Sequence, residues 1–379
     1  TRKPFVVVGV FILAISGYFL YVPPESLTVF YFASWSIIFY LGWTLFDVPH
    51  IAWASDIALE SGEKTRVYSF RSAMGYTGLV LFYCIPLLPF FDTTAITPET
   101  LRWSAIAALI LVLPCLLYSL MTVPNSVGIG HRISVKTLTD SKTVGLNALL
   151  TAVVKNRPFL LYLMAYVFYG LGVGIWSGLI FIYVDVYLGL GDKFSQMFLA
   201  AFIVGILVTP VWYKLAALFG KRCVWVSANI LVFLSCLYTG LLSPENSSSL
   251  QLMTLKIMNT MGFVCITIIA PSILSDIVDY STWKFKANRA AMYFSIHAFL
   301  LKFLAALGGA LGLFVVSVFG FDAQAAVQSD EAIIAMHTTI ALLPAICILI
   351  SLVLVMFIPV TARRHSIIRR RLNRYLEFN

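Results

Sequence analysis

The amino-acid sequence predicts an all-α fold, that of a polytopic helical membrane protein. The mean hydropathy is +0.92, and only 11% of the residues are charged. A soluble chain of 379 residues needs a charged surface that this composition cannot supply. The apolar runs are mostly about 20 residues or longer, which suits helices across a hydrocarbon core of roughly 30 Å. They lack the short alternating pattern of outer-membrane barrel strands.

Ten membrane helices are predicted along the chain, separated by breaks that carry polar residues, Pro or Gly. We expect them at residues 4–21, 28–56, 67–91, 101–123, 157–188, 194–214, 223–243, 250–279, 290–319 and 331–358. The longest break, residues 124–156, divides the chain into an N-terminal bundle at 1–123 and a six-helix C-terminal bundle at 157–360. Residues 361–379 form a basic tail.

Lysine and arginine residues segregate between the two sides of the predicted membrane. Of the 26, 21 fall at the termini or in alternate loops, whereas the other side holds only Arg102 and Lys193. The positive-inside rule therefore places loop 124–156 and both ends of this chain in the cytoplasm, with the helices in an inner or plasma membrane. Topology thus accounts for most of the net charge of +9, so no nucleic-acid partner is expected. The basic tail is expected to lie against anionic headgroups.

A short internal repeat points to a transporter. The fragment Ser55-Asp56-Ile57 recurs as Ser275-Asp276-Ile277, and each copy ends a long predicted helix before a basic loop. Four predicted helices precede the central loop and six follow it. The repeat and the helix count suggest two six-helix halves, with the first two helices absent from this chain, which starts without Met. Transporters are commonly built from such repeats, with the solute site between the halves.

Asp47 and Arg71 are ionisable residues within predicted helices, where such groups are candidates for function. Both lie about 12 residues from the turn near residue 59, so an antiparallel hairpin places them at similar depth, where they can pair. Such a pair either clamps the hairpin or lines a water-filled site where both groups meet a polar ligand. Pro49 favours the second interpretation, because it loosens the backbone beside Asp47.

Other polar residues are weaker candidates. Lys302 is predicted near mid-membrane, where it needs an acid or a water cavity. Asp276 and Asp279 share one helix face near the cytoplasmic end, either as a solvated helix end salt-bridged to cytoplasmic bases or as part of a functional site. His297 is a lone histidine, which more often packs with a hydrogen bond than relays protons. Trp43 lies close to Asp47, and an aromatic ring beside a charge pair suits a sugar.

Glycines at 308–312, in "GGALG", have the spacing that permits close helix packing. The six cysteines are scattered and form no CxxC or Cys/His cluster, so no metal site is predicted. The motifs HExxH and GxSxG and the phosphate loop are absent, so we predict neither an enzyme nor a covalently bound cofactor. An intramembrane enzyme or receptor is the alternative from another class.

These motifs resemble the glycoside–pentoside–hexuronide:cation symporters, the melibiose-carrier branch of the major facilitator superfamily. "DVPHIAWASDIALESGEKTRVYSFR" is similar to the signature of helices 4 and 5, and "SDIVDYSTWKFKANR…SIHAFLLK" to that of helices 10 and 11. "TRKPF" resembles the end of the loop between helices 2 and 3, and "NRPF" the entry to helix 7. The resemblance implies a major-facilitator two-bundle fold with about ten of its twelve helices present.

The resemblance also implies roles for individual residues. Asp47 and Arg71 match the sugar-binding acid and arginine of helices 4 and 5, and Lys302 matches the helix 11 lysine of the sugar and cation region. We therefore expect a substrate site at Asp47, Arg71, Lys302, His297 and Trp43. The matched acids of helix 10 imply a cytoplasmic gate, for which the candidates are Asp56, Asp276, Asp279 and Arg289. Ile51 replaces an aromatic residue and His297 an amide, which argues against melibiose as the solute.

The function expected from these features is cation-coupled symport of a sugar, glycoside or uronide by alternating access. The coupling cation implied is Na⁺ or H⁺, and the family's cation-binding acids lie on its first two helices. The expected partners are a small polar solute and the lipid bilayer, with the protein working as a monomer. An amphiphilic solute such as a lysolipid is the alternative within the same class.

Overall fold

The computed structural model describes residues 2–24, 28–58, 60–91, 97–124, 153–245, 247–285, 289–321, 328–359 and 361–377. Within these ranges the chain is built from helices and their connections, without a strand. Most of the predicted central loop, residues 125–152, lies outside the described residues. The all-α prediction is confirmed.

Four helices form the first group. They are α1 (Lys3–Tyr21), α2 (Val29–Ile57), α3 (Ser61–Cys84), which is followed by a 3₁₀ turn at Ile85–Leu87, and α4 (Pro98–Thr122).

The second group follows residue 156. It contains α7 (Arg157–Ile182) with a π-helical end at Tyr183–Tyr187, a 3₁₀ turn at Gly191–Lys193, α8 (Phe194–Phe219), α9 (Lys221–Thr239), α10 (Ser249–Phe285), α11 (Ala290–Val318), and α12 (Asp330–His337), which a π-helical turn at Thr338–Leu342 joins to α13 (Leu343–Met356). The chain ends in the tail helix α14 (Ala362–Glu377).

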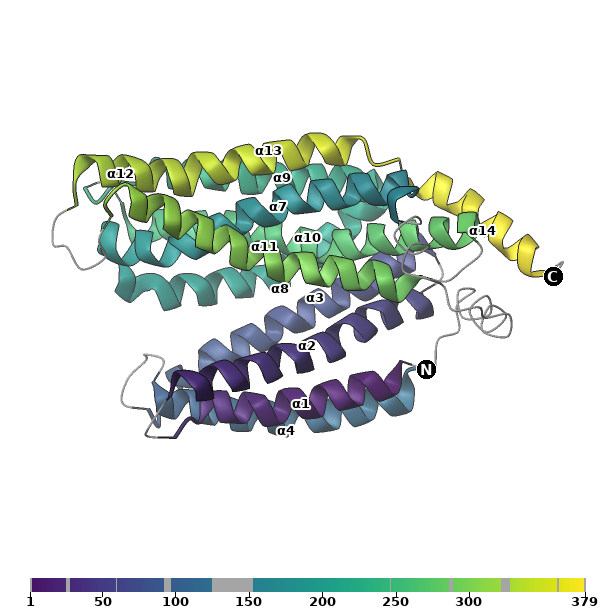
Figure 1. The fold of residues 1–379 in the computed structure, drawn as a ribbon, viewed down its shortest axis with the longest axis horizontal. Helices are drawn as coiled ribbons and strands as arrows, with labels where there is room; N and C mark the ends of the chain where they lie inside the picture. The colour runs from purple at the N-terminus through teal and green to yellow at the C-terminus, as the bar shows by residue number, and fades with distance from the viewer. Residues whose placement is uncertain are drawn as a thin grey trace.

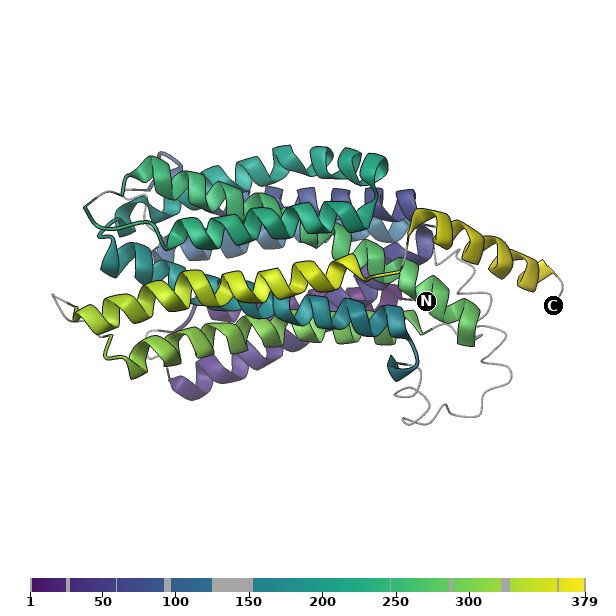
Figure 2. The ribbon, with the colours of Figure 1, turned by 90° about the horizontal axis from the view of Figure 1, so that it is seen from above.

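The long helices run roughly along one direction and separate into two layers (Figure 1). α1, α2, α3 and α4 lie on one side, and α7 to α13 lie on the other. α3 packs mainly against α8 and α10, and α2 contacts α11, so these helices join the two groups. α14 projects from the end where α1 begins and α13 ends (Figure 2). We call this end the basic end.

Nine helices of the described chain are long and apolar enough to cross a membrane, and they correspond to nine of the ten predicted spans. The exception is α3, which carries Glu63, Lys64 and Arg66 in its first turns and Arg71 with several Ser, Thr, Gly and Tyr residues beyond them. The start predicted for this helix, residue 67, is wrong: it begins at Ser61, where Glu60 and Glu63 form a capping box. The segment "ESGEKTR" is therefore helical, not a loop. Integral membrane character with many spans is confirmed.

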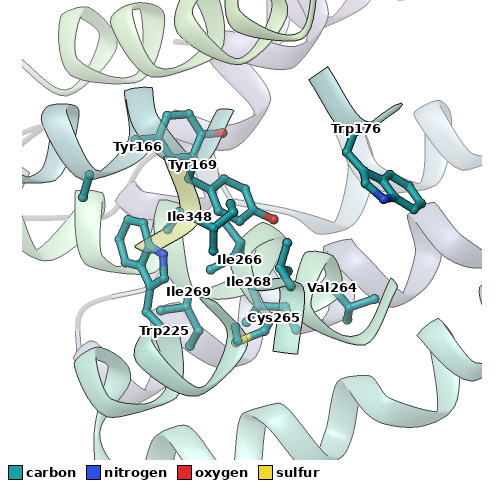
Figure 3. Close-up of a cluster of buried hydrophobic side chains, with 14 of the residues drawn as sticks. Tyr166, Tyr169, Trp176, Trp225, Val264, Cys265, Ile266, Ile268, Ile269 and Ile348 are labelled. Atoms are coloured by element: carbon teal, nitrogen blue, oxygen red, sulfur yellow. The ribbon is translucent and has the colours of Figure 1, made fainter. Parts of the chain in front are cut away.

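The main core lies within the second group. Figure 3 shows Tyr166 and Tyr169 of α7, Trp225 of α9, Ile348 of α13 and several α10 side chains directed toward one another. Many large apolar side chains of the outer helix surfaces are exposed instead, which fits contact with lipid.

Glycines bring α7 and α11 into direct backbone contact. The pairs Gly174/Gly178 and Gly308/Gly312 have the small-xxx-small spacing on both helices, as predicted for 308–312. A Cβ atom on Gly174 would lie 2.5 Å from the carbonyl oxygen of Leu304, and one on Gly178 would lie 2.5 Å from the Cα of Gly309. These close approaches fix how far α11 lies from α7.

We expect Gly174→Ala to lower the melting temperature of the purified protein, because the added methyl overpacks the α7–α11 contact by about 1–3 kcal/mol. Gly75→Ala is the matched control, since a Cβ there meets nothing within 4 Å. Equal melting temperatures for the two variants would contradict the close-packing interpretation.

Candidate functional site

Asp47 and Arg71 form an ion pair between α2 and α3. Arg71 Nη2 donates to Asp47 Oδ1 at 2.5 Å, and the side chains are 10% exposed for Asp47 and 32% for Arg71. The predicted pairing at matched depth is therefore present. The bond uses one nitrogen of a guanidinium with five N–H donors, so the exposed part of Arg71 can still donate to a ligand.

Lys302 reaches the same helix from the second group. Its Nζ donates to Thr44 Oγ1 at 3.1 Å and lies 5.2 Å from the centre of the Trp43 ring. Thr44 precedes Asp47 by one helical turn, so the ammonium and the carboxylate meet the same stretch of α2. Lys302 and Asp47 are not joined by an ion pair in the described chain, so both groups retain capacity for further hydrogen bonds.

His297 lies deeper in the second group than these residues. Its side chain is buried, its Nδ1 is 2.9 Å from the hydroxyl of Tyr162, and its ring lies 4.5 Å from that of Tyr166. Its hydrogen bond among the described residues is to Tyr162 and not to Asp47, Arg71 or Lys302, although the charge of Arg71 lies within electrostatic range of the ring. The structure thus brings Trp43 to the candidate site but gives His297 a packing environment.

A second set of charges joins α3, α9, α10 and α14 at the basic end. The ion-pair cluster comprises Lys64, Lys221, Asp276, Asp279, His365 and Arg369.

Lys64 of α3 lies at its centre, with no solvent exposure. Its Nζ is 2.6 Å from Asp279 Oδ2 and 3.7 Å from Asp276 Oδ1. The ammonium also donates to the carbonyl oxygen of Ser275 at 3.1 Å. His365 Nε2 of α14 approaches Asp279 Oδ2 at 2.8 Å. Since α3 belongs to one group and α10 and α14 to the other, the cluster closes the basic end.

Hydroxyl groups extend this closure between α2, α3 and α10. The two serine oxygens of the repeated fragment, Ser55 and Ser275, are 2.5 Å apart. Thr65 and Ser272 are 3.0 Å apart, and Ser61 donates to Asp276 at 2.7 Å. The two groups are therefore joined by hydrogen bonds along α10 as well as by charge.

The acids of the repeated fragments have equivalent partners. Asp56 Oδ2 is 2.8 Å from Arg2 Nε at the start of α1, and Asp276 Oδ2 is 2.6 Å from Lys221 Nζ at the start of α9. In both groups the acid thus meets a base at the beginning of the preceding helix. The contact of Asp56 stays within the first group, whereas that of Asp276 belongs to the cluster.

Arg289 stands apart from the cluster. Its guanidinium carbon lies 5.6 Å from the centre of the Phe285 ring, and its buried Nη1 has no hydrogen-bond partner among the described residues. The ion pairs of the described chain do not include Arg289. Of the four expected gate residues, two lie in the cluster.

Sequence reasoning missed Lys64, Lys221, His365 and Arg369 as members of the cluster. Lys64 was assigned to a loop, although Glu60 and Glu63 offered the pattern of a helix start. The other three lie at the ends of segments, where the sequence indicates only which side of the membrane they are on or that they belong to the basic tail. Asp276 and Asp279 on one helix face were the available signal, because buried acids need bases nearby.

Lys256 is a further charged side chain within a span. It is buried in α10, with its Nζ 3.9 Å from the Phe198 ring centre and 5.2 Å from that of Trp176. Phe198 also stacks on Tyr83 of α3, at 6.3 Å between ring centres. The Tyr83–Phe198 ring contact therefore connects the groups where α3 ends and α8 begins, and the cation–π contacts of Lys256 support Phe198 from within the second group. For the described residues, no cluster of His, Cys, Asp or Glu is arranged to hold a metal ion.

Comparisons with known proteins identify the family. A family model described as MFS/sugar transport protein matches residues 1–362. An uncharacterized symporter of Bacillus subtilis (strain 168) is 22% identical over 96% of this chain and 78% of its own length. The raffinose carrier protein of Pediococcus pentosaceus is 24% identical over 81% of this chain, which spans about half (47%) of that relative.

The solved structures give the same fold. The E. coli fucose:proton symporter aligns with a TM-score of 0.65 at 16% identity, covering 95% of this chain and 84% of its own. The resemblance to a sugar:cation symporter family, the major-facilitator fold and the prediction of a transporter instead of an enzyme are confirmed. The chain belongs to the MFS/sugar transport protein family.

Proposed function

We propose that the protein is a cation-coupled symporter of a sugar or glycoside, and that Asp47, Arg71, Lys302 and Trp43 bind the solute. The observation that carries this proposal is the approach of Lys302 from the second group to the turn of α2 that holds Asp47, beside Arg71. A solute that contacts all three charges bridges the two groups of helices. Solute binding is then coupled to their relative movement.

The chemistry of the three groups fits a polyol. A carboxylate accepts from sugar hydroxyls, and a guanidinium and an ammonium donate to them, in charge-assisted bonds. The indole of Trp43 offers an apolar face for a sugar ring. A cation, Na⁺ or H⁺, drives the uptake.

In this proposal the ion-pair cluster is the gate on the cytoplasmic side. Closing the basic end leaves the solute site reachable only from the opposite side. Lys64, Ser55 and Thr65 of the first group contact α10 of the second group. Breaking these contacts lets the two groups separate at the basic end. Alternating access follows from exchanging one closed end for the other.

Uptake into proteoliposomes tests the function. We expect the full-length protein to accumulate a sugar from a panel of glycosides and uronides when a Na⁺ or H⁺ gradient is imposed, and not without it. A lysolipid included in the panel tests the amphiphilic alternative. Gradient-driven uptake of the lysolipid alone would replace the sugar proposal.

Asp47→Asn keeps the shape of the side chain and removes its charge. We expect solute affinity to fall about ten- to hundredfold, because a charge-assisted hydrogen bond contributes roughly 1.5–3 kcal/mol. Glu331→Gln, at an exposed acid of α12, is the control. Binding of radiolabelled solute to purified protein measures the effect.

The double variant Asp47→Ala with Arg71→Ala separates binding from a hairpin clamp. If the pair only holds α2 to α3, removing both charges restores much of the transport lost in either single variant. We expect no such rescue, and rescue would reject the substrate site.

Lys64→Met removes the buried base that lies between Asp276 and Asp279, and removing one partner of a buried ion pair costs about 3–5 kcal/mol. We expect the melting temperature to drop by roughly 5 °C or more, and Lys64→Met with Asp279→Leu to regain most of it. Arg66→Met, two residues along α3 and exposed, is the control. An unchanged melting temperature for Lys64→Met would remove the cluster as a structural lock.

Labelling of single cysteines tests which side the basic end faces. In a chain whose native cysteines are replaced, an impermeant maleimide added to intact cells should label Phe90→Cys but not Ser366→Cys. Both native side chains are exposed, and they lie at opposite ends of the bundle. Labelling of position 366 before permeabilisation would reverse the proposed orientation.

A further inference from the structure

A cavity of about 530 Å³ opens at the basic end, between α3 on one side and α8, α9 and the start of the tail on the other. Its volume is typical of a site for a small organic ligand. The polar part of its wall comes from both groups of helices and includes Ser61, Thr65, Lys221, Arg222, Asp276 and Arg363.

The charges on this wall favour an anion. Lys221 is already paired with Asp276 at 2.6 Å. Arg222 Nη1 donates to the carbonyl oxygen of Met356 at 3.3 Å. The exposed side chain of Arg363 makes no ion pair in the described chain. Two guanidinium groups thus remain in excess of the acid, and planar guanidinium is well suited to bind phosphate through paired hydrogen bonds.

The α8–α9 turn adds backbone donors to the same wall. Gly220 has φ +82°, a conformation that favours glycine, and it reverses the chain directly into α9 without a side-chain cap. The first N–H groups of α9, at Lys221, Arg222 and Cys223, therefore have no side-chain acceptor at the capping position. All three residues line the cavity, so the positive end of this 19-residue helix faces it.

Asp276 supplies an independent observation that points to a ligand. Its side chain lines the cavity and is only 2% exposed. Oδ1 lies 3.7 Å from Lys64 Nζ and 3.5 Å from His365 Nε2 in ion pairs, and it accepts no hydrogen bond among the described residues. An acceptor of this kind, next to two spare guanidinium groups, suits a phosphate ester that also carries a hydroxyl or ammonium donor.

The apolar part of the wall indicates where such an ester comes from. Leu218 and Phe219 line the cavity and are 76% and 65% exposed, on the helix surface that continues along α8. Acyl chains attached to a bound phosphate can lie along this surface. Basic pockets between transmembrane helices on the cytoplasmic side of a membrane commonly bind lipid headgroups.

We propose that this cavity binds the phosphate and the neighbouring hydroxyl or ammonium group of a phospholipid headgroup. Arg222, Arg363 and the N-terminus of α9 hold the phosphate, and Asp276 accepts from the headgroup donor. Because α3 forms one wall and α8 and α9 the other, the bound headgroup stabilises the closed basic end. Headgroup binding is independent of which solute the protein transports.

Titration of the purified full-length protein with short-chain lipids tests the proposal. The probes are dioctanoyl phosphatidylglycerol and dioctanoyl phosphatidylethanolamine, with dioctanoylglycerol as the ligand that lacks phosphate, and native mass spectrometry reports binding. We expect the Arg222→Gln, Arg363→Gln double variant to bind both phospholipids at least about tenfold more weakly. Arg370→Gln, an exposed arginine of α14 outside the cavity, should bind within about twofold of the unmodified protein.

Unchanged phospholipid binding in the double variant, or equally tight binding of dioctanoylglycerol, would overturn the site. Glycerol 3-phosphate and inorganic phosphate carry the phosphate without acyl chains, so their binding is compared with that of the two phospholipids. If either binds as tightly as the lipids, the phosphate site stands and its assignment to a lipid is overturned. A photoreactive phosphatidylglycerol headgroup, used on the unmodified protein, should crosslink within residues 216–223, and crosslinks confined to other helices would also reject the site.

Discussion

The ammonium group of Lys64 has no solvent exposure, and the basic end of the molecule is organised around neutralising it. A buried charge without partners is so unfavourable that α3 can pack here only where acids from α10 meet it. Arg71 follows Lys64 by about two helical turns, so the position that Lys64 fixes also sets where Arg71 meets α2. The contact that closes one end of the protein thereby positions a residue of the candidate solute site.

The two ends of the α3–α8–α10 interface use different chemistry. Near the start of α3 the contacts are directional, with ion pairs and hydroxyl bonds of defined length. Near its end the contacts are between rings, where Tyr83 meets Phe198 and Phe202. Ring contacts tolerate sliding and tilting better than a buried ion pair, which loses most of its stabilisation when one partner moves away. Such an interface can pivot at the aromatic end while the charged end opens or closes.

Local patterns in the sequence predict much of the fold and one ion pair of the candidate site, that of Asp47 with Arg71. The length of the apolar runs predicted ten spans, nine of which are long and apolar enough among the described residues, and equal distance from a turn predicted the contact of Asp47 with Arg71. The start of α3 was placed too late, because hydropathy outweighed the capping residues Glu60 and Glu63.

Contacts between distant segments were harder to predict. Nothing in the sequence around His365 indicates that it meets Asp279, since that contact depends on α14 lying beside the end of α10. His297 is the opposite case. The resemblance to the symporter family makes it a candidate for solute binding, and only tertiary packing reveals Tyr162 as its partner.

The contact between Ser55 and Ser275 joins the two copies of the repeated fragment, one from each group of helices. In a symmetric dimer, a residue on the two-fold axis faces its own copy. Ser55 and Ser275 occupy the same place in the repeated fragment, and their flanking acids pair with bases at the starts of the preceding helices. The two groups of helices therefore meet through matching positions of the repeated fragment, as residues beside a two-fold axis do.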